Sequence, residues 1–164
     1  MRRDFLSLIR TRPMIKKASY AHRLRIDLSS RNEEELFKWF LACLLFGKPI
    51  QIEIAERAFQ ELVAARLTNL GAVIRAGWDN LVRLLDRAHY VIYDFSTATK
   101  LLGVCEELKR CYGTLTNLLA QTRIASELSR RSQEFKHIGP VTTRIVLRDV
   151  RPIWYRSAAL EKGT

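Results

Sequence analysis

The fold of this chain is decided by one stretch, Phe135-Lys136-His137-Ile138-Gly139-Pro140-Val141-Thr142. It lies at the centre of residues 124–150, between two segments whose apolar side chains recur at helical spacing. The chain turns at Gly139, and Pro140 is the residue type best suited to the first position of a new helix. The stretch therefore predicts two helices joined by a short hairpin. The unpaired backbone N–H groups that open the second helix form a site for an anion, and a phosphate is the expected one.

These residues resemble the helix-hairpin-helix of the HhH-GPD superfamily, the endonuclease-three-like DNA glycosylases. The resemblance begins upstream at about Asn32 and includes Leu36-Phe37-Lys38-Trp39-Phe40-Leu41-Ala42 and Tyr93-Asp94-Phe95-Ser96-Thr97-Ala98. It implies an all-α fold of the DNA-glycosylase type, with a single helical domain over residues 31–164. Residues 1–30 are then a basic N-terminal extension that packs on this core.

In this family the backbone amides of the hairpin hold a DNA phosphate without reading the base sequence. The resemblance gives this role to the amides of Gly139, Val141 and Thr142, with added positive charge from Lys136 and Arg144. The full set of residues expected to bind DNA is Lys136, His137, Gly139, Val141, Thr142, Arg144 and Arg148 in the hairpin, with Lys48 and Gln51 upstream. The alternative is a helix corner that merely packs on its neighbours.

A monovalent cation, Na⁺ or K⁺, often sits on the hairpin carbonyls of this family. The resemblance places it here near Phe135 and His137. His137 stands where the family usually has the first hairpin glycine, and a positive φ costs more free energy with histidine than with glycine. We therefore expect a slightly altered turn. No other cofactor is expected.

A second candidate DNA contact is the loop Gly47-Lys48-Pro49-Ile50-Gln51, which follows an apolar helix. The family places here the residues that wedge into the duplex when a base is flipped out, because a stacked base hides its glycosidic bond. Lys48 matches the wedge position approximately, and Gln51 is a neighbour of a suitable type. A plain helix stop with a solvated lysine is the alternative, and both remain open.

Catalysis is where the sequence departs from the family. Bifunctional members have a nucleophilic lysine where this chain has Val141, and valine cannot form an imine. A Schiff-base lyase reaction is therefore not expected. The aspartate that the family uses falls on Ala159, so the catalytic residue stays unidentified, with Asp149 and Asp94 as the candidates. Asp94 is better suited to capping a helix.

Two functions follow from these observations. The first is a DNA-repair-type protein that hydrolyses a damaged base as a monofunctional glycosylase. The second is a non-catalytic DNA-binding module, which keeps the glycosylase fold and has lost the catalytic Lys and Asp. A structural protein with a basic face by chance is a third reading, which the hairpin opposes.

The formal charge of +11 is unevenly spread along the chain. Residues 1–30 carry eight Lys or Arg against two acids, residues 31–120 carry eleven of each, and residues 121–164 carry nine against four. A neutral middle between two basic ends favours a polyanionic partner, and we expect duplex DNA, possibly damaged. An anionic membrane surface and a merely soluble basic protein are the alternatives.

The cysteines are Cys43, Cys105 and Cys111, and their spacing is not that of a zinc site. We expect buried free thiols in a reducing compartment. Some relatives carry an iron–sulfur cluster on four cysteines after the hairpin. Because no cysteine follows Cys111, no iron–sulfur cluster is expected.

The longest apolar stretch, residues 39–46, is too short to span a bilayer and predicts a buried helix. We expect an intracellular protein, cytoplasmic or nucleoid-associated, that does not enter a membrane. A monomer is expected.

Helical spacing dominates the middle of the chain. Asn32 is expected to cap a helix that begins with Glu33-Glu34-Glu35 and continues through the apolar residues 36–46. Further helices are expected near residues 54–63, 73–85, 98–108 and 115–120, with an aromatic loop over 90–95. The alternation in residues 22–28 has strand spacing but no partner strand, so an extended segment packed on the helices is expected.

Aromatic residues could line a base pocket in this fold by stacking. The candidates are Trp39, Trp78, Tyr90 and Tyr93. Aromatic residues at helical spacing belong more often to the core, so this alternative stays beside the functional one.

Overall fold

The structure is a computed structural model that describes residues 18–121 and 130–131. The helices are α2 (Ala18–Arg23), α3 (Glu33–Phe46), α4 (Ile52–Ala64), α5 (Leu70–Arg87), α6 (Asp94–Tyr112) and α7 (Leu115–Gln121), with a 3-10 turn η1 (Leu28–Ser30). Within these residues there is no strand, so the all-α prediction is confirmed for this part of the chain.

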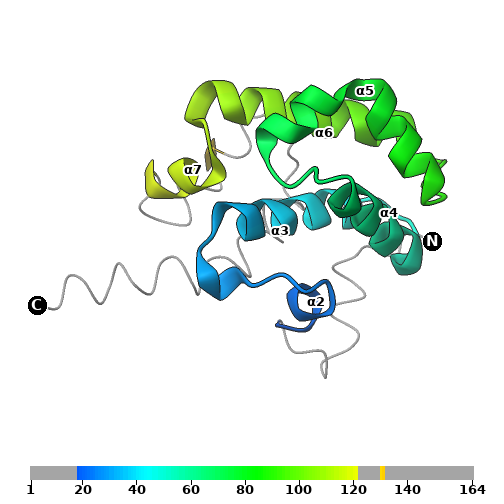
Figure 1. The fold of residues 1–164 in the computed structure, drawn as a ribbon, viewed down its shortest axis with the longest axis horizontal. Coiled ribbons are helices and arrows are strands. Elements are labelled where there is room, and N and C mark those ends of the chain that lie inside the picture. Colours follow the sequence, from blue (N-terminus) through cyan, green and yellow to red (C-terminus); the bar gives the residue numbers. More distant parts are fainter. Residues whose placement is uncertain (1–17, 122–129, 132–164) are drawn as a thin grey trace, which may run out of the picture.

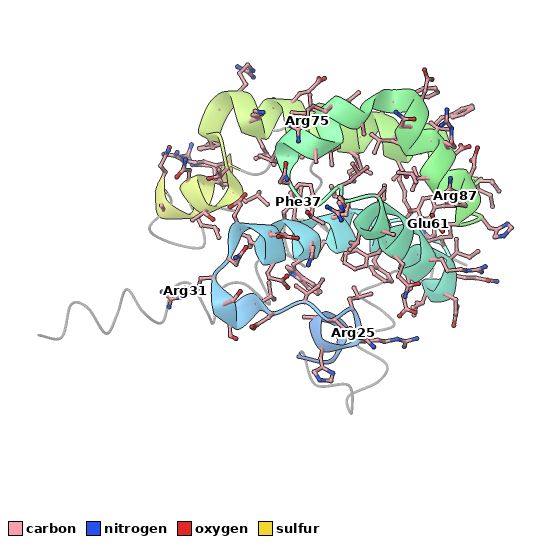
Figure 2. All side chains as sticks on the ribbon, viewed as in Figure 1. Arg25, Arg31, Phe37, Glu61, Arg75 and Arg87 are labelled. Carbon is pink, nitrogen blue, oxygen red and sulfur yellow. The ribbon has the colours of Figure 1, made fainter. Side chains whose placement is uncertain are left out.

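The helices surround α3. Figure 1 shows α5 and α6 side by side along one edge of the molecule, with α3 and α4 beneath them. The central helix contacts α4, α6, α7 and η1. Phe37 of α3 is fully buried and lies between the two groups of helices (Figure 2). The core of the described region is therefore built around one helix.

The sequence explains why α3 takes this central place. The Asn32 side chain caps it by accepting a hydrogen bond from the Glu34 N–H at 2.8 Å, as the capping prediction requires. The remaining turns bury apolar side chains on every face: Leu36, Phe37, Trp39, Phe40, Leu41, Ala42, Cys43, Leu44, Leu45 and Phe46. Gly47 ends the helix. A helix that is apolar all round is stable only when it is covered on all sides.

The expectation of an extended segment over residues 22–28 is wrong, because α2 continues to Arg23, a turn follows at residues 24–25, and η1 begins at Leu28. Arg25 adopts a left-handed conformation (φ 57°), and Ile26 donates its N–H to the Ala21 carbonyl at 2.7 Å. This turn directs Ile26 and Leu28 into the core. The alternating apolar pattern thus comes from a helix end and a 3-10 turn rather than from a strand.

The end of α4 has the same backbone arrangement. Arg66 is left-handed (φ 62°) and donates its N–H to the Val63 carbonyl at 2.9 Å. Leu67 donates its N–H to the Leu62 carbonyl at 3.0 Å and is itself buried. These bonds form a Schellman motif, whose left-handed position usually holds glycine. Arginine at this position carries backbone strain.

Helix α7 is tied to α3 by one carboxylate. Glu33 accepts hydrogen bonds from the N–H groups of Leu115 and Thr116, each at 2.8 Å, and a third from the Thr116 hydroxyl. The two N–H groups belong to the first turn of α7, where the helix leaves donors without intrahelical partners. Glu33 therefore serves as the cap of a helix more than 80 residues away, which a pattern of three successive glutamates does not reveal.

We predict that Arg66→Gly raises the free energy of unfolding by about 1 kcal/mol, because glycine adopts the left-handed conformation without strain. Urea denaturation of the full chain measures the change. Arg66→Ala is the matched control, since alanine keeps the strain while removing the same charge. Equal effects of the two substitutions would show that the charge matters and not the backbone.

We also predict that Glu33→Ala lowers the free energy of unfolding by about 2 kcal/mol, because partly buried N–H donors lose a charged acceptor. Glu34→Ala removes a carboxylate one position along, whose ion pair with Lys38 spans 3.8 Å on the surface. That control is expected to cost less than about 0.5 kcal/mol. Similar losses in both variants would contradict the special role of Glu33.

Candidate functional site

Most of the predicted DNA-binding residues lie outside the described residues. These are Lys136, His137, Gly139, Val141, Thr142, Arg144 and Arg148, together with the expected cation position near Phe135 and the candidate acid Asp149. The hairpin of residues 124–150 therefore remains a prediction. Lys48, Gln51 and Asp94 are described, and they lie near the place where α3 ends and α6 begins.

A buried tyrosine joins these two helix ends. Tyr90 lies in the connection between α5 and α6, and its hydroxyl donates a hydrogen bond to the Leu45 carbonyl of α3 at 2.7 Å. Its backbone closes a Schellman motif at the end of α5, with His89 left-handed (φ 64°). Burial raises the pKa of the Tyr90 phenol. This residue belongs to the core and does not line a base pocket.

Next to this hydrogen bond lies a group of charged and aromatic side chains that we call the α3–α6 corner: Lys48, Asp86, Tyr93, Asp94 and Lys100. Lys48 is half-buried, and its Nζ lies 5.4 Å from the centre of the Tyr93 ring. At this distance the ammonium is attracted by the face of the ring. Lys48 is therefore held near Tyr93.

Lys100 contributes a second amine to the corner, two turns along α6 from Tyr93. It is half-buried, and burial together with the charge of Lys48 lowers the pKa of Lys100. Neither lysine has a carboxylate within 4.0 Å among the described residues. Sequence reasoning missed Lys100, although the seven-residue spacing from Tyr93 places both on one side of a helix.

Asp94 has a different place from the one expected. Tyr93 holds the cap position of α6, and Asp94 is the first residue of the helix. The Asp94 carboxylate accepts a hydrogen bond from the Phe95 N–H at 2.6 Å, where negative charge suits the start of a helix. A hydrogen bond with Asp94 raises the pKa of the Asp86 carboxyl group at the end of α5. The structure thus brings two carboxyl groups together, and nothing in the local sequence predicts this pair.

Gln51 is exposed just before α4. It occupies the cap position of that helix, but its side chain makes no capping hydrogen bond. Its backbone carbonyl accepts from the N–H groups of Ile54 and Ala55, each at 3.1 Å. The amide side chain is therefore presented on the same loop as Lys48.

Apolar side chains are exposed on the connection that leads into α6. Ile92 is 80% exposed and Val91 is 56% exposed. Phe95 stacks on Trp78, with 5.2 Å between ring centres, and the Trp78 indole donates to the Thr99 hydroxyl at 3.0 Å. Of the two alternatives that the sequence left open for Trp78, the core position does not fit, because the side chain is partly exposed.

A break in α5 accounts for this position of Trp78. Gly77 has φ 76° and ψ 170°, a backbone conformation that is almost exclusive to glycine. The helix is interrupted there, so the side chains on either side of Gly77 do not share one helical periodicity. Trp39, by contrast, is buried in α3 as a core residue.

The cysteines do not form a site. Cys43 and Cys105 are buried, and burial raises the pKa of the Cys105 thiol to about 12. Cys111 is exposed, so the expectation of three buried thiols is wrong for it, because it lies on the outer side of the last turn of α6. Within residues 18–121, no group of His, Cys, Asp and Glu side chains could hold a metal ion. In the same region, no helix has both the length and the apolarity needed to cross a membrane.

Comparison of the chain with protein-family models, with curated proteins and with solved structures found no match in any of the three.

We predict that Asp86→Asn stabilises the protein at neutral pH, with a gain that disappears in acid. The hydrogen bond with Asp94 raises the folded-state pKa of Asp86 above its unfolded value, so stability conferred by the shared proton is present at low pH and is lost as pH rises through the folded pKa. Thermal unfolding between pH 3 and pH 8 measures the difference. Asp79→Asn, on the exposed side of the same helix, is the control for the loss of one carboxylate, and an equal effect of both substitutions would contradict the role of the Asp86–Asp94 pair.

Proposed function

We propose that this protein binds duplex DNA through the helix-hairpin-helix of residues 124–150 and acts as a monofunctional, glycosylase-like base-excision protein. The resemblance of the hairpin and the two basic ends of the chain support this proposal. The observation that carries it furthest lies in the described region, where the Lys48 loop and the exposed connection before α6 meet at the α3–α6 corner.

The corner combines the features that opening a duplex requires. An enzyme that flips a base must fill or hold the space left in the stack, and apolar side chains often do so. Ile92 is strongly exposed and directly precedes Tyr93, against which Lys48 is held. Lysines at this place can neutralise phosphates on either side of the opened step. Ile92 is therefore the wedge in this proposal, with Lys48 and Gln51 beside it.

The stacked pair of Trp78 and Phe95 supports the same proposal. Exposed aromatic faces stack on unpaired bases, whatever the base sequence. Phe95 lies in the first turn of α6, two residues after Tyr93, and Trp78 reaches it from α5. The stacked pair offers a surface for a displaced base or for the strand beside it.

The chemistry of base release rests on the two carboxyl groups. A carboxyl group with a raised pKa keeps its proton longer and can donate it to a departing base, as Asp86 could beside Asp94. The competing function is a non-catalytic DNA-binding module. It is favoured by the engagement of Asp94, which already bonds the Phe95 N–H and the Asp86 carboxyl group.

The experiment measures binding and base release on one panel of duplexes that carry abasic, uracil, oxidised and alkylated sites. Release of any base supports the glycosylase, and its loss in Asp86→Asn or Asp94→Asn identifies the acid. Tight binding without release supports the DNA-binding module. Absence of binding at moderate salt would overturn both functions.

We predict that Ile92→Ala weakens binding to an abasic duplex by roughly tenfold, about the contribution of one well-placed apolar wedge. Binding to an intact duplex is expected to change less than about twofold, because phosphate contacts there are unaffected. Fluorescence anisotropy with both duplexes measures the two affinities. Lys38→Ala, on the side of α3 where Lys38 pairs with Glu35, is the control for a general loss of stability or charge. Equal weakening on both duplexes would contradict the wedge.

A further inference from the structure

Two cations from different helices meet at the start of α5, at the end of the α5–α6 pair away from the α3–α6 corner. A methyl group added at Gly71 would stand 3.1 Å from Nη1 of Arg75 and 3.2 Å from Nζ of Lys109. The two nitrogens therefore lie no farther apart than the sum of these distances. Arg75 comes from the first half of α5 (Figure 2) and Lys109 from the last turn of α6, so only the packing of the two helices brings them together.

No acid neutralises this pair in the described part of the chain. Neither Arg75 nor Lys109 has a carboxylate oxygen within 4.0 Å there. Asp79 follows Arg75 by four residues, the usual spacing of a helical ion pair, but the break at Gly77 takes it out of register. Glu106 precedes Lys109 by three residues and also lies beyond that distance. Two like charges held this close repel each other, and an anion between them replaces the repulsion with attraction.

The chemistry of the ligand follows from the two head groups. A guanidinium presents a fork of N–H donors that matches phosphate oxygens, and an ammonium is a compact charge that binds a further oxygen. Gly71 has no side chain in the gap between them, so an oxyanion can approach the backbone. The Asn69 Oδ1 lies 3.4 Å from the same point and already accepts the Ala72 N–H as the cap of α5. The two cations therefore define the site, and the helix start does not.

We propose that Arg75 and Lys109 form a binding site for one phosphate group, with Gly71 as its floor. The phosphate belongs either to the DNA backbone or to free inorganic phosphate, and the same contacts hold both. Only the DNA source rests on the proposed function. Along α6, Lys109 lies about 22 Å from Asp94. A duplex covers this distance in about six base pairs, so a DNA phosphate bound here anchors the duplex at a distance from the opened step.

The first measurement titrates inorganic phosphate into the isotopically labelled full chain, with sodium chloride at equal ionic strength as the reference. NMR follows the backbone amide signal of Gly71. We expect a shift that saturates in the parent protein, and binding that is weakened roughly threefold or more in Arg75→Gln and in Lys109→Gln. Arg110→Gln removes the next exposed charge on α6 and is the matched control, which should titrate as the parent does.

Gly71→Ala separates the site from a general loss of positive charge. It keeps both cations, but its methyl group stands in the gap and pushes the flexible ends of the two side chains aside. Gly71 does not have a positive φ, and alanine is the better helix former. We therefore expect an unchanged or higher melting temperature together with roughly threefold weaker phosphate binding.

The second measurement determines the affinity of the same variants for a DNA duplex by fluorescence anisotropy at several salt concentrations. In Arg75→Gln and Lys109→Gln, loss of one phosphate contact is expected to lower the affinity roughly fivefold. The slope of log affinity against log salt concentration should fall by about one. Arg110→Gln is expected to change both quantities less.

The outcomes separate this inference from the proposed function. A saturable phosphate shift that depends on Arg75, Lys109 and Gly71 supports the site, and absence of DNA binding then overturns only the proposed function. Weaker DNA binding in these variants, without an equal loss in Arg110→Gln, assigns the phosphate to the duplex. Absence of saturable phosphate binding, together with no loss of DNA binding beyond that of Arg110→Gln, overturns the site.

Discussion

The hydrogen bond from the Tyr90 hydroxyl to the Leu45 carbonyl joins the end of α3 to the connection between α5 and α6. The last carbonyl groups of a helix lack intrahelical partners, and a buried one without a partner costs free energy. Tyr90 satisfies this requirement at the end of α3 from a position 45 residues away. The loop that carries Lys48 and the connection that carries Tyr93 must therefore lie together. The contact between Lys48 and the Tyr93 ring depends on this constraint.

The residues of the α3–α6 corner are connected by contacts between different segments of the chain. Lys48 lies over the Tyr93 ring in the connection before α6. Asp94 forms a hydrogen bond with Asp86 at the end of α5. The charge of Lys48 contributes to the lowered pKa of Lys100. Each of these pairs joins segments that are far apart in the sequence or separated by a helix end. A proposed function that uses only the hairpin would leave these contacts unexplained. The proposed base flipping would use these groups together, because a base that is taken out of the stack must be replaced and its pocket lined.

The sequence was sufficient to predict the central helix α3, but it was insufficient to predict the contacts of the α3–α6 corner. Asn32 and the apolar run after it predicted α3 closely, because capping and burial are both local in sequence. The alternating pattern at Ile26 and Leu28 led to the wrong prediction of an extended segment, because a helix that ends in a left-handed turn can produce the same spacing of apolar residues as a strand. For Trp78 the sequence left a base pocket and a core position open, because no local rule shows that Gly77 breaks the helix. The pKa shifts of Lys100 and Asp86 depend on Lys48 and Asp94, and only the fold brings these partners close.

The break at Gly77 has a consequence for spectroscopy. It leaves Trp78 partly exposed to water, while Trp39 of α3 is buried in the core. The two indoles therefore differ in polarity of environment and in access to dissolved molecules. Acrylamide or iodide should quench the emission of Trp78 and spare that of Trp39. Among the tryptophans of the described residues, Trp78 is therefore the optical reporter, and its emission is expected to change when something covers the indole that stacks on Phe95.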